Sequence, residues 1–246
     1  MIGGAVEDNV IAQIWDTITQ VNPPPELFTI IVTGIAAVAV IAFRPLWRWG
    51  RNVITIVHEG GHAFVAVLTG RRLRGVRLHS DTSGLTYSAG DRRGFSAIAT
   101  LFAGYVAPAA LGLLSAWLIS TGYVVLLLWL NLVLLAALAL FIRNLYGMVA
   151  TGVTGLVIFA TVWWADAEIQ SFIVYAGTWF LLFGAVRPVW ETWAVRHRGQ
   201  RQTDPDQLAR ITAVPAVVWL VLFAMLNLGA LVLGIQLLTP QLWQQL

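Results

Sequence analysis

The chain contains one short motif whose residue types and spacing could perform hydrolysis, because residues 58–62 read His-Glu-Gly-Gly-His. Two histidines four positions apart lie on one face of a helix, so His58 and His62 can bind the same Zn²⁺ ion. Zinc lowers the pKa of a bound water to about 7, and a glutamate next to the first histidine is placed to accept that proton. The motif therefore predicts a zinc site with Glu59 as the general base.

The motif lies inside an apolar stretch that runs from Val53 to Leu68. Polar and charged groups at membrane depth are costly, and where they occur they usually serve a function. The alternative is that the three polar side chains only pack between helices. Gly60 and Gly61 favour the zinc site: each costs roughly 1 kcal/mol of helix propensity, but lets a neighbouring helix or an extended peptide approach the metal closely.

Composition indicates a membrane protein with little soluble mass. Hydrophobic residues make up 58% of the 246 residues and charged residues 11%, whereas a soluble domain carries about 25% charge. The mean hydropathy is +0.76. Cysteine is absent, which excludes disulfides and thiolate metal sites. We expect no nucleic-acid partner, because the arginines flank apolar segments and act as topology signals.

The pattern of apolar segments predicts an all-α polytopic membrane protein with about seven transmembrane helices. About 20 apolar residues are needed to cross the hydrocarbon core of a bilayer. Residues 1–25 form a separate amphipathic segment, in which residues 7–21 are expected to be a helix on the membrane surface. Residues 26–246 are expected to form one integral membrane domain. The predicted spans are 27–43, 46–69, 95–119, 123–142, 145–165, 172–186 and 213–238.

The distribution of arginine predicts the orientation. Three arginines (Arg44, Arg48 and Arg51) fall on one side of the membrane, at the junction of the first two spans and in the first turns of the second, and the other twelve fall on the opposite side. The positive-inside rule places the larger group in the cytoplasm, with the amino terminus cytoplasmic and the carboxyl terminus outside. His62 then lies roughly 12 Å from the cytoplasmic end of its helix, at 1.5 Å per residue. Water and substrate are expected to enter from that side.

The segment 73–89 is predicted to be a small cytoplasmic β-hairpin between the second and third helices. Its apolar positions alternate, and residues 81–84 carry turn residues. A free edge of this hairpin could bind an extended substrate by strand addition. The alternative is a plain connection between two helices, which we rank slightly lower because the hairpin follows the motif so closely. His79 is interpreted as a surface histidine, with a ligand or substrate contact left open.

Four sequence blocks, in order, resemble one family. These blocks are HEGGHAFVAVLTG from His58, VRLHSDTSGLT from Val76, RNLYG from Arg143, and TDPDQLARITAVPAVVW from Thr203. Together they resemble bacterial membrane proteins related to the site-2 protease family of intramembrane zinc metalloproteases. The resemblance implies a Zn²⁺-dependent peptidase that cuts within or near transmembrane segments. It also implies that His58 and His62 are zinc ligands and that Glu59 is the general base.

The chain departs from the family at the third zinc ligand, because the usual Asn-Pro-Asp-Gly-like motif is absent. Asp204 and Asp206 lie just before the last span, on the side from which the site opens. Asp206 is expected to cap a helix that starts near Gln207, which leaves Asp204 as the predicted ligand. Asp81 is the next choice, and water alone is a third. Asn144 could bind an extended substrate backbone or cap a helix.

Two functions of different classes follow. The first is an intramembrane zinc endopeptidase in a bacterial plasma membrane, whose partners are the lipid bilayer and a membrane-protein substrate. The second is a non-proteolytic scaffold or metal-binding membrane protein that keeps the same fold. Glu59 favours the first, because a metal carrier needs the histidines but has no use for a proton acceptor beside them. The sequence leaves the substrate, the regulators and the oligomeric state open.

Overall fold

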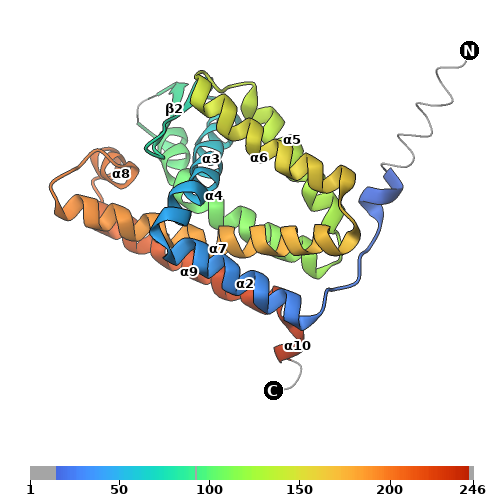
Figure 1. The fold of residues 1–246 in the computed structure, drawn as a ribbon. Helices are drawn as coiled ribbons and strands as arrows, with labels where there is room; N and C mark the ends of the chain where they lie inside the picture. Colours follow the sequence, from blue (N-terminus) through green and yellow to red (C-terminus); the bar gives the residue numbers. More distant parts are fainter. Residues whose placement is uncertain (1–14, 92, 244–246) are drawn as a thin grey trace, which may run out of the picture.

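A computed structural model describes residues 15–91 and 93–243 of the chain as a helical molecule with one small sheet (Figure 1). The helices are labelled from α2, as in the figure. The elements are α2 (Leu27–Ala42), α3 (Arg44–Leu68), β1 (Arg72–Leu78), β2 (Gly84–Ala89), α4 (Phe95–Ser120), α5 (Val124–Ala139), α6 (Leu145–Trp164), α7 (Ala167–His197), α8 (Asp204–Thr212), α9 (Ala216–Leu238) and α10 (Pro240–Trp243).

Four described helices, α4, α6, α7 and α9, are long and apolar enough to cross a membrane, and the bent pair α2–α3 raises the number to five. The chain is therefore an integral membrane protein. Each of the seven predicted spans contains a helix, but seven crossings are not confirmed. Helices α2 and α5 have 16 residues each, or about 24 Å at 1.5 Å per residue, which is shorter than the roughly 30 Å hydrocarbon core.

The bend between α2 and α3 is 103° and sets the direction of the helix that carries the motif. Phe43 joins the two helices in an extended conformation. Pro45 follows in the first turn of α3, where its missing N–H group would have had no partner within the helix. The sequence predicted two separate spans here, and the structure shows that they are two arms of one sharply bent pair.

Helix α7 is longer than predicted, because 31 residues are helical where the hydropathy pattern gave 172–186. The polar residues that end the apolar run do not end the helix. Glu191 accepts hydrogen bonds from Arg187 and from the Trp47 indole, both at 2.9 Å, so these polar groups continue the packing of α7 against α3. The next helix, α8, begins at Asp204 rather than near Gln207.

The predicted hairpin is confirmed, because β1 and β2 pair antiparallel. Strand β1 also pairs on its other side with the α5–α6 connection, where the Val76 N–H donates to the Phe141 carbonyl at 2.8 Å. The Asn144 amide completes this side by donating to the Leu78 carbonyl at 2.6 Å and accepting from its N–H at 3.1 Å. Strand β1 is therefore central, and within the described chain β2 is the edge strand.

Helix α3 packs most extensively against α4, and α4 in turn packs on α7 and α9. The contact between α3 and α4 requires glycine: a Cβ atom at Gly61 would lie 2.4 Å from the Cβ atom of Ala107. This confirms that Gly61 allows close helix approach. A Cβ atom at Gly60 would instead make an ordinary van der Waals contact with Leu138, at 3.7 Å.

Of the predicted amino-terminal helix, residues 15–19 are helical and residues 7–14 lie outside the described residues.

Candidate metal centre

The side chains of His58 and His62 converge through the Nε2 atoms of their rings. The Nε2 atoms of His58 and His62 lie 3.1 Å apart, and their rings meet edge to face. Both come from consecutive turns of α3, as the four-residue spacing predicts. Tyr105 of α4 makes a second edge-to-face contact with the His58 ring, with ring centroids 5.0 Å apart. The His58 ring thus contacts both His62 and α4.

Asp204 brings a carboxylate to both histidines, although it follows His58 by 146 residues in the chain. Its Oδ2 atom lies 3.2 Å from His58 Nε2 and 3.3 Å from His62 Nε2. The start of α8 explains this placement, because Thr203 is the N-cap and Asp204 the first helical residue. The expectation that Asp206 is the N-cap was wrong: it occupies the third helical position and completes a capping box with Thr203. Asp206 also pairs with Arg196.

These three donors fit a tetrahedral metal ion. Ligand atoms on a tetrahedral zinc with bonds of about 2.1 Å lie about 3.4 Å apart, and the three separations here are 3.1, 3.2 and 3.3 Å. Two imidazole nitrogens and one carboxylate form a donor set typical of catalytic zinc sites. The residues present therefore fit a metal cofactor.

Helix α4 holds the His62 ring through Nδ1, the ring nitrogen that does not face the cluster. The Nδ1 atom of His62 lies 2.6 Å from the backbone carbonyl of Thr100. Because a carbonyl can only accept, Nδ1 donates to Thr100, and this contact turns Nε2 toward the cluster, which is the orientation that metal-binding histidines usually have. A Cβ atom at Gly104 would lie 2.4 Å from His62 Nε2 and 2.7 Å from His58 Nε2. Only glycine leaves room for both rings.

Glu59 lies beside this cluster but is held by the hairpin. Its side chain is buried, and its Oε2 atom accepts a hydrogen bond of 2.6 Å from the Thr86 hydroxyl. Gly84 of β2 packs directly on the carboxylate, because a Cβ atom there would lie 2.5 Å from Glu59 Oε1. Glu59 also offers an oxygen within 4.8 Å of the histidine nitrogens. We regard Asp204 as the better ligand, since it is closer and faces both histidines.

The charge state of Asp204 follows from its neighbours. Burial alone would raise the pKa of the Asp204 carboxyl, but the charge of His62 and hydrogen bonds with His58 and His62 outweigh burial and hold this pKa well below its usual value. Asp204 is therefore ionised at neutral pH, and an ionised carboxylate is the form that binds a metal.

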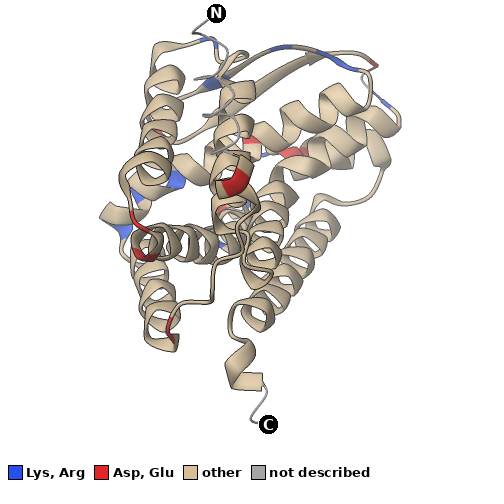
Figure 2. Ribbon diagram, turned by 90° about the vertical axis from the view of Figure 1, so that its right-hand side faces the viewer, with Lys and Arg blue, Asp and Glu red and all other residues tan. Residues whose placement is uncertain are grey.

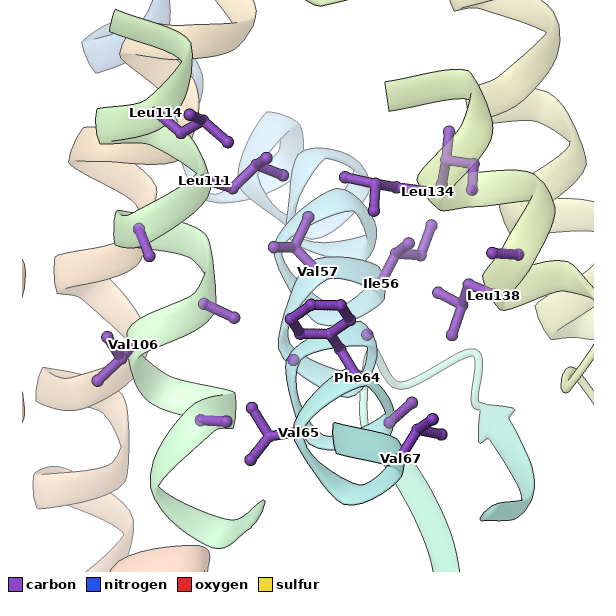
Figure 3. A pocket seen from close by; sticks show the side chains of 18 of the residues that line it. Ile56, Val57, Phe64, Val65, Val67, Val106, Leu111, Leu114, Leu134 and Leu138 are labelled. Carbon is purple, nitrogen blue, oxygen red and sulfur yellow. The ribbon is translucent and has the colours of Figure 1, made fainter. Parts of the chain in front are cut away.

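A polar cavity of about 1580 Å³ opens onto the cluster and is lined by α3, the hairpin, α4, α7 and α8. A second cavity, of about 1100 Å³, lies against the other face of α3 (Figure 3). Val57 and Phe64 of α3 project into it, together with apolar residues of α4 and α5 such as Leu111 and Leu134. One helix thus separates the polar cavity from an apolar one.

The remaining sequence candidates lie elsewhere. The Asp81 carboxylate accepts hydrogen bonds from the N–H and hydroxyl of Ser83 within the hairpin turn, which lowers its pKa. His79 is exposed, as predicted for a surface histidine. Asn144 does bind an extended backbone, but that of β1 in the same chain. Sequence reasoning missed Thr86, Thr100 and Gly104, because no local pattern connects them with residues 58–62.

Residues 31–234 match the model of the Peptidase M50B-like family. Comparisons with curated proteins and with solved structures gave no match. The matched region contains most of α2, all of α3, the hairpin, and His58, Glu59, His62 and Asp204. It also agrees with the sequence resemblance to site-2 proteases. The chain therefore belongs to the Peptidase M50B-like family and is a membrane protein related to the site-2 proteases.

Proposed function

We propose that the chain is an intramembrane zinc metallopeptidase that hydrolyses peptide bonds in, or next to, transmembrane segments of membrane proteins. The observation that carries this proposal is the convergence of His58, His62 and Asp204, within 3.3 Å of one another, beside the buried Glu59. In this proposal the three converging residues are the zinc ligands. Bound zinc would supply a Lewis acid that polarises the scissile carbonyl and acidifies water.

The protein's own groups supply the rest of the chemistry. The carboxylate of Glu59 accepts a proton from the attacking water and later returns one to the leaving amine. The Thr86 hydroxyl fixes one carboxylate oxygen, so the other is available for this exchange. The Thr100 carbonyl fixes the His62 ring. Each contact reduces the reorganisation that the reaction would otherwise need.

The hairpin offers a way to hold the substrate. A helical segment hides its scissile carbonyl in a hydrogen bond, so a substrate must be extended before it is cut. Strand β2 lines the polar cavity, and its neighbour β1 is already paired on both sides. Strand addition at β2 would hold an extended peptide beside Glu59.

The proposal includes the topology and the domain organisation. Residues 26–246 form one membrane domain with seven spans, and residues 1–25 are an amphipathic segment on the membrane surface. The amino terminus is cytoplasmic and the carboxyl terminus outside, in a bacterial plasma membrane. The site then opens to the cytoplasm, which supplies water through the polar cavity.

The decisive experiment replaces the general base. Glu59→Gln keeps the size of the side chain but removes the proton acceptor, which is typically worth about 10² to 10⁴ in rate. We expect this variant to keep zinc and to retain uncut membrane-protein partners that the wild type releases as shortened fragments. Glu168→Gln, an exposed position in the first turn of α7, is the matched control and should behave as wild type.

The readout is the length and amount of membrane proteins that co-purify with each form. Shortened partners with the wild type and full-length partners with Glu59→Gln support the peptidase. Identical partner lengths and amounts in zinc-loaded wild type and variant would contradict it, and would favour the alternative scaffold function.

A further inference from the structure

The polar cavity that contains the metal cluster carries an excess of arginine. Its lining includes only three acidic residues, Glu59, Asp204 and Glu191, among the described residues. Six arginines line the same cavity, which are Arg51, Arg71, Arg74, Arg93, Arg198 and Arg210. Figure 2 shows arginine in blue and acidic residues in red along the ribbon.

The acidic groups of the cavity are already engaged. Glu59 accepts from Thr86, Asp204 lies against both histidines, and Glu191 pairs with Arg51 at 3.4 Å and with Arg187 at 2.9 Å. None of them is therefore available to neutralise the remaining arginines.

Among the described residues, five of the six arginines have no carboxylate partner. Four of these five are exposed, namely Arg74, Arg93, Arg198 and Arg210. Arg71 differs, because its guanidinium donates to Ser88, Ser96 and the Asp91 carbonyl. The four exposed arginines come from two separate regions of the chain. Arg74 lies in β1 and Arg93 in the connection before α4, whereas Arg198 follows the end of α7 and Arg210 lies in α8.

We propose that this cavity selects peptide segments that carry acidic residues near the bond to be cut. The inference rests on the proposed function and names its substrate class. Guanidinium groups bind carboxylates through paired hydrogen bonds, and the two arginine groups line the same cavity as the cluster and β2. A peptide held along β2 would contact these arginines. An anionic lipid headgroup would bind arginines outside the cavity as readily as those inside it.

The test measures binding, so that it does not depend on cleavage. Short fluorescent peptides with two glutamates on each side of an apolar centre are compared with otherwise identical glutamine and lysine peptides. Anisotropy is recorded with the zinc-loaded Glu59→Gln protein in an uncharged detergent. We expect the glutamate peptide to bind about tenfold more tightly than the glutamine peptide, since each exposed pair contributes up to about 1 kcal/mol, and the preference to shrink with salt.

Charge reversal then identifies the residues. Arg198→Glu with Arg210→Glu should abolish the preference for the glutamate peptide and improve binding of the lysine peptide. The matched control is Arg72→Glu with Arg201→Glu, two exposed arginines that do not line the cavity, and it should keep the wild-type preference.

Three results would overturn the inference. The first is equal binding of glutamate and glutamine peptides, and the second is loss of the preference in the control pair. The third is that Arg198→Glu with Arg210→Glu changes only the partition of the protein into vesicles with and without phosphatidylglycerol, which would assign the arginines to lipid. Failure of the proposed function looks different: the acidic preference stands, yet the wild type cuts no peptide.

Discussion

The hydroxyl of Thr86 donates a 2.6 Å hydrogen bond to the Oε2 atom of Glu59, and the same hydroxyl lies 3.2 Å from the Glu59 backbone carbonyl. Glu59 belongs to helix α3 and Thr86 to strand β2. This contact joins the proposed general base directly to the proposed substrate-binding strand. A change in the position of the strand is therefore also a change in the position of the base.

Replacement of Thr86 by valine removes this hydrogen bond while keeping the shape of the side chain. A hydrogen bond to a charged group is worth about 1.5–3 kcal/mol, so we expect peptide cleavage to fall about 10- to 100-fold, mainly in kcat. Zinc content should be unchanged, because Thr86 does not contact the histidines. Thr86→Ser, which keeps the hydroxyl, should restore most of the activity. Equal rates for the valine and serine variants would show that the hydroxyl has no role.

Alanine at Gly104 should disturb the metal centre without touching a ligand. The new methyl group would lie 2.4 Å from His62 Nε2, so one ring or helix α4 must move, and we expect loss of zinc measured by elemental analysis. Gly152→Ala is the control, because a Cβ atom there meets nothing within 4 Å. That change should leave zinc in place and should favour helix α6 by up to about 1 kcal/mol.

The double variant with His58→Ala and His62→Ala should hold no zinc, whereas the wild type should hold about one zinc per chain. Circular dichroism should show the same helical content for both, because alanine has the highest helix propensity of all residues. Zinc content that stays at the wild-type level in the folded double variant would remove the central claim.

Loss of an outer-shell partner typically weakens metal binding about 10- to 100-fold. Asp204→Ala removes a proposed ligand and should weaken zinc binding by more than that. Asp206→Ala should instead reduce stability, by about 1 kcal/mol for the capping box and further through the lost pairing with Arg196. A zinc titration and a thermal melt separate the two effects. If Asp204→Ala binds zinc normally while Asp81→Ala does not, the third ligand lies in the hairpin.

Cysteine labelling tests the topology, because the chain contains no cysteine. Gln200→Cys and Gln245→Cys place single thiols in the proposed cytoplasmic loop and at the proposed outer terminus. An impermeant maleimide applied to intact cells should label position 245 and not position 200. The opposite pattern would invert the orientation and move the opening of the metal site to the outer face.

The sequence predicted the parts of the site that lie within one turn of helix. His58, Glu59 and His62 are close together because the helical period makes them so, whatever the rest of the fold. The hairpin was equally predictable, because its alternation and turn residues are local signals. Both features depend on interactions between residues that are near in the chain.

Other features depend on tertiary packing and were predicted poorly or not at all. Thr86 reaches Glu59, and Thr100 and Gly104 reach the histidines, only because β2 and α4 pack on α3. Asn144 was expected to serve a substrate or a cap, but its amide groups bind β1, a pairing across 66 residues. The extension of α7 past residue 186 depends on Glu191 contacting Trp47 in another helix. A hydropathy pattern contains no information on contacts between distant residues. The lengths and the number of the membrane spans were therefore the weakest predictions.

Helix α3 has a different solvent on each face, since the polar cavity borders the histidines and the apolar cavity borders Val57 and Phe64. Water occupies the first kind of space, and hydrocarbon chains suit the second. In a membrane, lipid chains that enter the apolar cavity would contact the helix that carries the site. Detergents and lipids of different chain length should fill the apolar cavity to different extents. The position of α3, and with it the geometry of the metal centre, should therefore depend on the length of the acyl chain.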